Sequence, residues 1–230
     1  MQTSRQRRIR RSPWLGALGA LSLFAACASS GSTATGDSVA FAGRAPERLK
    51  PEEYTDAVHI YDHACKEGSV QACSYLGFMY DNALGVSQDI PRAIALSKQA
   101  CEAGVAYGCA YLGYLFQTGR GVAPNPREAA QLFRTACEGE DASGCLLLGI
   151  MYKTGSGVPA NARYAALLFT RACRDGESLA CVSLGYMYAN GEGVPRNELR
   201  AQELFRRACA NEDPIGCQAS VQLARRQPVP

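Results

Sequence analysis

The feature that most constrains the fold of this 230-residue chain is a cysteine pair that returns every 36 residues. Five pairs follow one another without insertion or deletion, and seven residues separate the two cysteines of each pair: Cys65 and Cys73, Cys101 and Cys109, Cys137 and Cys145, Cys173 and Cys181, Cys209 and Cys217. A fixed period of this length is typical of repeat arrays, in which each unit packs mainly on its neighbours. We therefore expect one array of repeats, although the length alone would suggest one or two globular domains.

Each repeat has the signals of two helices joined by short turns. In residues 65–100, a first helix is expected to begin near Val70 and to end at the glycine-containing turn N-A-L-G-V. A second helix is expected after Asp89, a good N-cap residue, with Pro91 in its first turn and Gly104 at its C-terminal end. Asn125, Asn161 and Asn197 hold the position of Asp89 in the later repeats. Because no alternating strand pattern occurs, the chain is predicted to be all-α.

Apolar residues spaced by three and four define the faces that these helices bury. In the second helices an alanine column is followed three residues later by an Ile/Leu column: Ala57, Ala93, Ala129, Ala165 and Ala201, then Ile60, Leu96, Leu132, Leu168 and Leu204. In the first helices a leucine precedes a glycine in four repeats, and the glycines are Gly77, Gly113, Gly149 and Gly185. A mid-helix glycine costs roughly 1 kcal/mol relative to alanine. Its return therefore predicts a neighbouring helix that passes too close for a Cβ atom.

Residues 1–26 have the layout of a secretory signal peptide. A basic stretch, MQTSRQRRIRRSP, precedes an apolar run, WLGALGALSLFAACASS, that is too short to cross a bilayer as a permanent helix. The segment L-F-A-A-C resembles a bacterial lipobox, in which Cys27 would carry the lipid and become the new N-terminus. The alternative is ordinary cleavage at Ala26-Cys27-Ala28, which has the small-x-small form.

Cleavage before Cys27 changes the net charge and sets the domain boundaries. Five arginines are lost, so 24 basic residues fall to 19 against 21 acidic ones, and the net charge changes from +3 to about −2. A basic surface for nucleic acid is therefore not expected. Residues 27–46, rich in serine, glycine, alanine and threonine, are expected to form a flexible tether, residues 47–226 the repeat domain, and residues 227–230 a C-terminal tail.

The place of the cysteines within the repeat predicts local disulfides. The first cysteine of each pair lies in the last turn of one expected helix and the second in the first turns of the next, so both lie at the closed end of a helical hairpin. A disulfide needs Cα atoms roughly 4.4–6.8 Å apart, whereas stacked helices lie about 8–10 Å apart. Zinc is the alternative use of paired cysteines, but its ligands are usually separated by about two to four residues. With an export signal present, we expect five bridges, one within each pair.

The repeat resembles a known family. The pattern A-C-x-x-L-G-x-x-Y-x-x-G-x-G-V, found at residues 180–194 and, with glycine in the first place, at residues 144–158, is similar to the Sel1-like repeat, a relative of the tetratricopeptide repeat. The 36-residue period with Cys-x7-Cys in every unit resembles the Helicobacter cysteine-rich protein family. The resemblance covers about residues 47–226 and implies a right-handed αα-superhelical solenoid of disulfide-bridged repeats. It also implies a role in protein interaction, and some relatives are described as penicillin-binding proteins or weak β-lactamases.

The residues needed for β-lactam hydrolysis are not found. A serine β-lactamase usually needs S-x-x-K, and no serine in this chain is followed three residues later by lysine. Lys153-Thr154-Gly155 matches the K-T-G of such enzymes, but the equivalent positions in other repeats differ, so we interpret it as the end of a first helix. His59 and His63 have the spacing of a metal or haem ligand pair, but their columns are variable and are interpreted as solvent-facing. We expect no catalytic residue, metal or cofactor, and a penicillin-binding or weakly hydrolysing protein is the alternative.

The remaining candidate site is a strip of aromatic and apolar residues on the first helices. Its members are Tyr75, Phe78, Tyr111, Tyr114, Ile150 and Tyr186, with Leu147 and Ser183 beside them and Tyr107 and Leu179 at one edge. Asp81, Gln117 and Lys153 are expected along the rim. Tyrosine combines a large contact area with a polar tip, which suits recognition of an extended peptide. The alternative is that these side chains pack between adjacent repeats and are largely buried.

These observations predict an exported, lipid-anchored scaffold without chemistry of its own. Its expected partner is a protein or peptide of the bacterial envelope, and it is expected to be a monomer that touches the membrane only through the lipid on Cys27. Ala28 is not the aspartate that retains lipoproteins in the inner membrane. We therefore expect the periplasmic side of the outer membrane.

Overall fold

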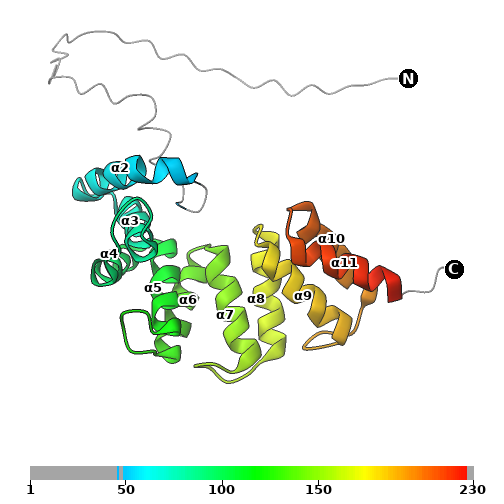
Figure 1. Ribbon diagram of the computed structural model, residues 1–230. Coiled ribbons are helices and arrows are strands. Elements are labelled where there is room, and N and C mark those ends of the chain that lie inside the picture. Colours follow the sequence, from blue (N-terminus) through cyan, green and yellow to red (C-terminus); the bar gives the residue numbers. More distant parts are fainter. Residues whose placement is uncertain (1–45, 47–48, 227–230) are drawn as a thin grey trace, which may run out of the picture. The chain divides into compact units, whose positions relative to one another are not determined.

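The computed structural model describes residues 46 and 49–226, which lie in one compact unit, and every regular element in this part of the chain is a helix. The elements are the 3-10 helix η2 (Pro51–Glu53) and the α-helices α2 (Tyr54–Lys66), α3 (Val70–Asn82), α4 (Ile90–Glu102), α5 (Ala106–Thr118), α6 (Pro126–Glu138), α7 (Ala142–Thr154), α8 (Ala162–Arg174), α9 (Ser178–Asn190), α10 (Glu198–Ala210) and α11 (Pro214–Arg226). Each helix from α2 to α11 packs on the next one in the sequence (Figure 1). The predicted all-α array of helical hairpins is confirmed.

Each full repeat contributes one first helix and one second helix. The first helices are α3, α5, α7 and α9, and the second helices are α4, α6, α8 and α10. By the 36-residue period, α2 corresponds to a second helix and α11 to a first helix. First helices also contact one another, since α3 packs on α5, α5 on α7, and α9 on α11. We call the surface formed by α3, α5, α7, α9 and α11 the first-helix face.

Local signals set the helix ends where the sequence predicts them. The side chain of Asp89 accepts a hydrogen bond from the backbone N–H of Arg92 at 3.0 Å, and the asparagines in the same column cap the later second helices in the same way. Three first helices end at a glycine in the left-handed conformation, for which glycine has no steric penalty. The first repeat has Ala83 there, with φ +55°, so this alanine adopts a conformation that L-residues rarely take.

Phenylalanines of the second helices pack against the glycines of the first helices. Phe133, Phe169 and Phe205 are buried. A Cβ atom added to Gly149 would lie 2.6 Å from the ring of Phe169, and one added to Gly185 would lie 2.5 Å from the ring of Phe205. The predicted close approach of a neighbouring helix is therefore confirmed. The phenylalanine column follows the predicted leucine column by one residue and is not among the predicted core positions. It is buried as well, because a buried helical stripe can be about 100° wide.

All five predicted disulfides are present. The Cα–Cα distances are 4.4–4.8 Å, and each bridge links the last turn of one helix to the first turns of the next: Cys65–Cys73, Cys101–Cys109, Cys137–Cys145, Cys173–Cys181 and Cys209–Cys217. The second cysteine of the four full repeats is completely or almost completely buried. Each bridge therefore closes one end of a hairpin and faces its interior.

The predicted signal peptide, the predicted lipidation site at Cys27, the predicted tether except Pro46, and the predicted C-terminal tail lie outside the described residues. Among residues 46 and 49–226, no helix has the length and apolar character needed to span a membrane.

Candidate binding site

Three residues of the predicted aromatic strip meet in one cavity on the first-helix face. Phe78 on α3 and Tyr111 and Tyr114 on α5 line a space of about 250 Å³. The other lining residues are Asn82, Tyr107, Ala110, Ser143 and Leu147. The cavity thus draws side chains from α3, α5 and α7, the first helices of three successive repeats. We call it the aromatic pocket.

Tyr111 stands at the centre of the aromatic wall. Its ring is nearly parallel to that of Tyr107, with centroids 6.4 Å apart, and is stacked on that of Tyr114 at 6.0 Å. The ring of Phe78 meets it edge-on at 5.2 Å. These separations and angles are those that aromatic pairs prefer. The rings therefore support one another, and the pocket is formed without a ligand.

The other three residues of the predicted strip do not line the pocket. Tyr75 is only 8% exposed and packs between Tyr61 and Tyr107, with ring centroids 5.5 and 5.3 Å away. Ile150 is half-buried against the core. Tyr186 is 41% exposed and packs on the ring of Phe205, outside the pocket. The strip is therefore not one continuous exposed surface, because its members differ in what the neighbouring helices place against them.

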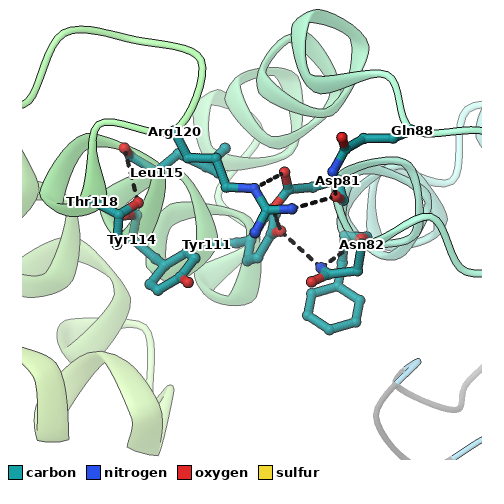
Figure 2. A network of polar contacts seen from close by, with 9 residues as sticks. Asp81, Asn82, Gln88, Tyr111, Tyr114, Leu115, Thr118 and Arg120 are labelled. Carbon is teal, nitrogen blue, oxygen red and sulfur yellow. Dashed lines mark hydrogen bonds and ion pairs between the residues drawn. The ribbon is translucent and has the colours of Figure 1, made fainter.

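Asp81 was predicted to lie on the rim of the strip, and this prediction is wrong. Its carboxylate is completely buried, with Oδ1 2.6 Å from Nε of Arg120, and it accepts a hydrogen bond from the hydroxyl of Tyr111 (Figure 2). Arg120 and Gln88 donate to its backbone carbonyl, each at 2.7 Å. The sequence gives a weak signal for this network. Among the equivalent positions of the four full repeats, Asp81 is the one acidic residue in its column. Arg120, in the loop after α5, is likewise the one basic residue in its column.

The environment of Tyr111 raises the pKa of its hydroxyl. Burial is the largest cause, and the hydrogen bond to the Asp81 carboxylate is the next. Both disfavour the phenolate, because it would be poorly solvated and would lie beside a negative charge. Tyr111 is therefore a neutral hydrogen-bond donor to Asp81.

The buried network and the aromatic pocket share two side chains. The Asn82 amide group donates one hydrogen bond to the backbone carbonyl of Phe78 at 2.9 Å and another to the hydroxyl of Tyr111 at 3.1 Å. Asn82 and Tyr111 also line the pocket. The Asp81–Arg120 pair therefore holds the central ring of the pocket wall from behind, without lining the pocket.

Neither the K-T-G sequence nor the histidine pair has the surroundings of a catalytic or metal site. Lys153 forms an ion pair with Glu192 at 3.2 Å, the hydroxyl of Thr154 donates to the Ile150 carbonyl at 2.9 Å, and Gly155 caps α7. These residues form the end of a first helix, as predicted. His59 and His63 are both exposed. Nowhere in the described part of the chain do three or more histidine, cysteine, aspartate or glutamate side chains gather as they would to hold a metal ion.

Solved structures with the same fold include Sel1 repeat proteins. The Sel1 repeat protein from Oxalobacter formigenes is 26% identical, with a TM-score of 0.66 over 72% of this chain and 66% of that one. A protective antigen present in uropathogenic Escherichia coli strains, which displays an SLR fold, is 29% identical, with a TM-score of 0.63 over 71% of this chain and 35% of the antigen. Helicobacter pylori cysteine rich protein B is 29% identical over 58% of this chain and 96% of that one, with a TM-score of 0.46. The chain thus spans about two thirds of the first protein and about a third of the second.

A comparison with curated proteins found no match. The Sel1 repeat family model matches four consecutive segments of the chain, residues 70–105, 106–141, 142–177 and 178–213. Each segment is one first helix, one second helix and the turns that follow them. The four segments make up more than half of the chain, and their boundaries coincide with the structural repeats. The chain belongs to the Sel1 repeat family.

Proposed function

We propose that this protein is a binding scaffold, and that its first-helix face holds an extended segment of a partner protein with the aromatic pocket as the anchor point. The observation that carries this proposal is the preformed pocket of about 250 Å³, walled by Phe78, Tyr107, Tyr111 and Tyr114. Aromatic side chains in a pocket near the centre of a surface are the usual hot spots of protein interfaces.

The charge distribution on the first helices supports the same proposal. The helices α5 and α9 contain no charged residue, α3 contains only Asp81, and α7 contains only Lys153. Asp81 is buried and paired with Arg120, and Lys153 is paired with Glu192. From α3 to α9 the face therefore presents aromatic and neutral polar groups with little net charge, whereas the sequence of α11 ends in Arg225 and Arg226. Depletion of charged residues and enrichment of aromatic ones characterise the core of protein interfaces.

A photocrosslinking experiment in the native cell tests this function. Benzoylphenylalanine placed at Thr118, which is exposed one helical turn after Tyr114 and outside the pocket, should form a covalent adduct with a specific partner, which mass spectrometry of the adduct would identify. Tyr114→Ala, combined with this probe, should lower the adduct yield at least about tenfold, as loss of a hot-spot aromatic does. Tyr186→Ala is the matched control, because Tyr186 holds the same column, is similarly exposed and lies outside the pocket. An adduct yield that Tyr114→Ala leaves unchanged would reject the pocket as the anchor.

We further propose that the scaffold is exported and anchored by a lipid on Cys27, on the periplasmic side of the outer membrane. Five disulfides support an oxidising compartment, because such bridges are rare in the cytosol. The wild-type protein should incorporate labelled palmitate and fractionate with the outer membrane, whereas Cys27→Ala should do neither. Ala28→Asp should keep the label and move the protein to the inner membrane. An unlabelled wild-type protein in the soluble periplasmic fraction would indicate ordinary cleavage instead.

A further inference from the structure

Three polar side chains of the aromatic pocket, Asn82, Tyr111 and Ser143, already use their hydrogen-bond donors within the protein, and this favours one kind of ligand group. We propose that the pocket binds the guanidinium group of an arginine side chain in the partner segment. This inference rests on the proposed function, because it names the chemistry of the group that enters the pocket.

Asn82 presents an acceptor to the pocket. Both hydrogen atoms of its side-chain amide are used, one toward the carbonyl oxygen of Phe78 and one toward the hydroxyl of Tyr111. The backbone carbonyl can only accept hydrogen bonds, so it determines which end of the amide is nitrogen. The side-chain oxygen of Asn82 is left for a ligand, and it can only accept.

Two other polar side chains of the pocket have no proton to offer. The hydroxyl of Tyr111 donates its proton to the carboxylate of Asp81, and the hydroxyl of Ser143 donates its proton to Oδ1 of Asp141. A hydroxyl has one proton and two lone pairs, so any further hydrogen bond at these oxygens must come from the ligand. Asn82, Tyr111 and Ser143 lie on three different helices, α3, α5 and α7. At these three positions a ligand can form hydrogen bonds only by donating them, which favours a ligand with several donors.

The electrostatics of the pocket favour a cation over a neutral donor. Its wall consists of four aromatic rings, whose faces are negative and attract cations, and no lining residue carries a charge. The positive charge nearest in the network, on Arg120, is paired with Asp81. The Asp141 carboxylate accepts hydrogen bonds from the Ser143 hydroxyl and from the backbone N–H of Gly144, and it forms no ion pair within the described residues. A cation in the pocket thus meets ring faces and an unpaired carboxylate nearby.

The size of the cavity and the arrangement of its acceptors favour arginine over lysine or a small-molecule ligand. A space of about 250 Å³ lies below the roughly 300–1,000 Å³ of ordinary small-molecule sites, and it suits one long side chain. The guanidinium group is flat, stacks on aromatic faces and carries five donors that spread in one plane. Lysine has only a compact point charge, which cannot stack on a ring face. Tyr114, which stacks on Tyr111 and is 37% exposed, leaves its other face for such a group.

The test is a titration of the full-length protein, purified with its disulfides intact and labelled with ¹³C on its tyrosine rings. The probes are N-acetyl-arginine amide, N-acetyl-citrulline amide and N-acetyl-norleucine amide. Citrulline keeps the shape and most of the donors of arginine but lacks the charge, and norleucine keeps only the apolar stem. We expect saturable shifts of the Tyr111 and Tyr114 signals with arginine, at least about fivefold weaker binding of citrulline, and the weakest binding of norleucine. The Tyr186 signal in the same spectrum is the internal control and should not move.

Equal affinity for arginine and citrulline, tighter binding of norleucine, or no saturable shift at Tyr114 would each overturn the proposal. As a second measurement, Ser143→Ala should weaken the arginine probe about threefold or more, because it removes one acceptor and leaves the rings in place. The photocrosslinking experiment does not depend on which side chain enters the pocket. Crosslinks at Thr118 without an arginine preference would therefore refute this inference alone, and the absence of both would refute the proposed function as well.

Discussion

At the scale of single residues, the glycine column shows how a neighbouring side chain can exclude a Cβ atom. Gly113, Gly149 and Gly185 each face a phenylalanine ring at a distance that leaves no room for a Cβ atom. The equivalent position of α11 is Val221, whose side chain is 51% exposed. No second helix follows α11 in the described part of the chain. A branched side chain is therefore tolerated at Val221, where no second helix covers the column.

Gly149→Ala should destabilise the protein. Overpacking against the ring of Phe169 costs about 1–3 kcal/mol, and this outweighs or cancels the roughly 1 kcal/mol that alanine gains in helix propensity. Urea unfolding followed by circular dichroism would measure the change. Val221→Ala places the same residue in the same column and should stay within about 0.5 kcal/mol of the wild type. If Gly149→Ala stabilises the protein, the glycine is not selected by this contact.

Tyr111→Phe should destabilise the protein by about 1.5–3 kcal/mol, because it removes a hydrogen bond to the buried carboxylate of Asp81. Tyr114→Phe, at an exposed position of the same helix, should change the stability by less than about 0.5 kcal/mol. Urea unfolding at neutral pH compares the two variants. Equal effects would show that the hydroxyl of Tyr111 contributes nothing to the network.

The same tyrosine should make stability depend on alkaline pH. The pKa of Tyr111 is raised in the folded protein, whereas an unfolded tyrosine ionises near pH 10. The contribution of Tyr111 is therefore complete below about pH 10 and decreases as the pH rises above it, because the unfolded chain then releases a proton that the folded chain keeps. Unfolding free energies at pH 9 and 11 should fall more steeply for the wild type than for Tyr111→Phe. Identical slopes would contradict the raised pKa.

At the scale of the elements, each hairpin is a small unit with several local supports. Every α-helix from α2 to α11 has 13 residues. Isolated helices of this length are marginal in water. An Asp or Asn cap begins each second helix, a left-handed residue ends each first helix, and a disulfide closes the hairpin at one end. These devices hold the helices in place while stacking on the next repeat buries their faces.

Replacing both cysteines of a central bridge should destabilise the array without unfolding it. For Cys137→Ala with Cys145→Ala, loss of the short closed loop is expected to cost about 2–3 kcal/mol on the chain-entropy model. Unfolding by urea would measure the loss, and peptide mapping without reductant should show the other four bridges unchanged. Cys209→Ala with Cys217→Ala, at the last hairpin, is the comparison for position in the array. A cost near zero in both variants would mean that stacking alone holds the hairpins.

At the scale of the whole array, two ion pairs join successive repeats at the same pair of positions with opposite polarity. Asp81 pairs with Arg120 across 39 residues, and Lys153 pairs with Glu192 across the same separation two repeats later. In the repeat between them the equivalent residues are Gln117 and Ser156, which are neutral. The repeats are thus alike in their core but differ at the contacts that join one to the next. Such differences favour one order of repeats over a shifted one.

The two ion pairs should differ in how much they stabilise the folded protein. Arg120→Ala leaves the completely buried Asp81 carboxylate without its cation and should cost about 3–5 kcal/mol, as loss of one partner of a buried pair does. Lys153→Ala breaks a pair in which both side chains are about one-third exposed, so it should cost less than about 1 kcal/mol. Urea unfolding of the two variants gives the comparison. Equal costs would contradict the different burial of the two pairs.

The array as a whole could be predicted from the sequence, but the composition of the binding site could be predicted only in part. The columns of alanine, leucine and glycine repeat in several units, so their common role could be inferred from the pattern. Phe78, Tyr111 and Tyr114 were predicted to lie together on the first helices, and the structure places them in one pocket. Tyr75 and Asp81 were predicted to be at the surface and are buried. The pattern could not show this, because each of them is covered by side chains particular to one repeat.

What the sequence determined by itself is local: the period, the two helices of each repeat, their caps, the five disulfide pairs and the close contact at the glycines. Each of these depends on residues within one unit or on its copy in the next, so the signal returns at every period. Only the tertiary structure decided which strip residues share a pocket, which acidic side chain is buried, and which pocket protons are already used. These depend on contacts between residues about 30 to 40 positions apart, such as Asn82 with Tyr111 and Asp81 with Arg120, that occur once in the chain. A contact that occurs once leaves no periodic signal, and it becomes visible only when neighbouring repeats are stacked.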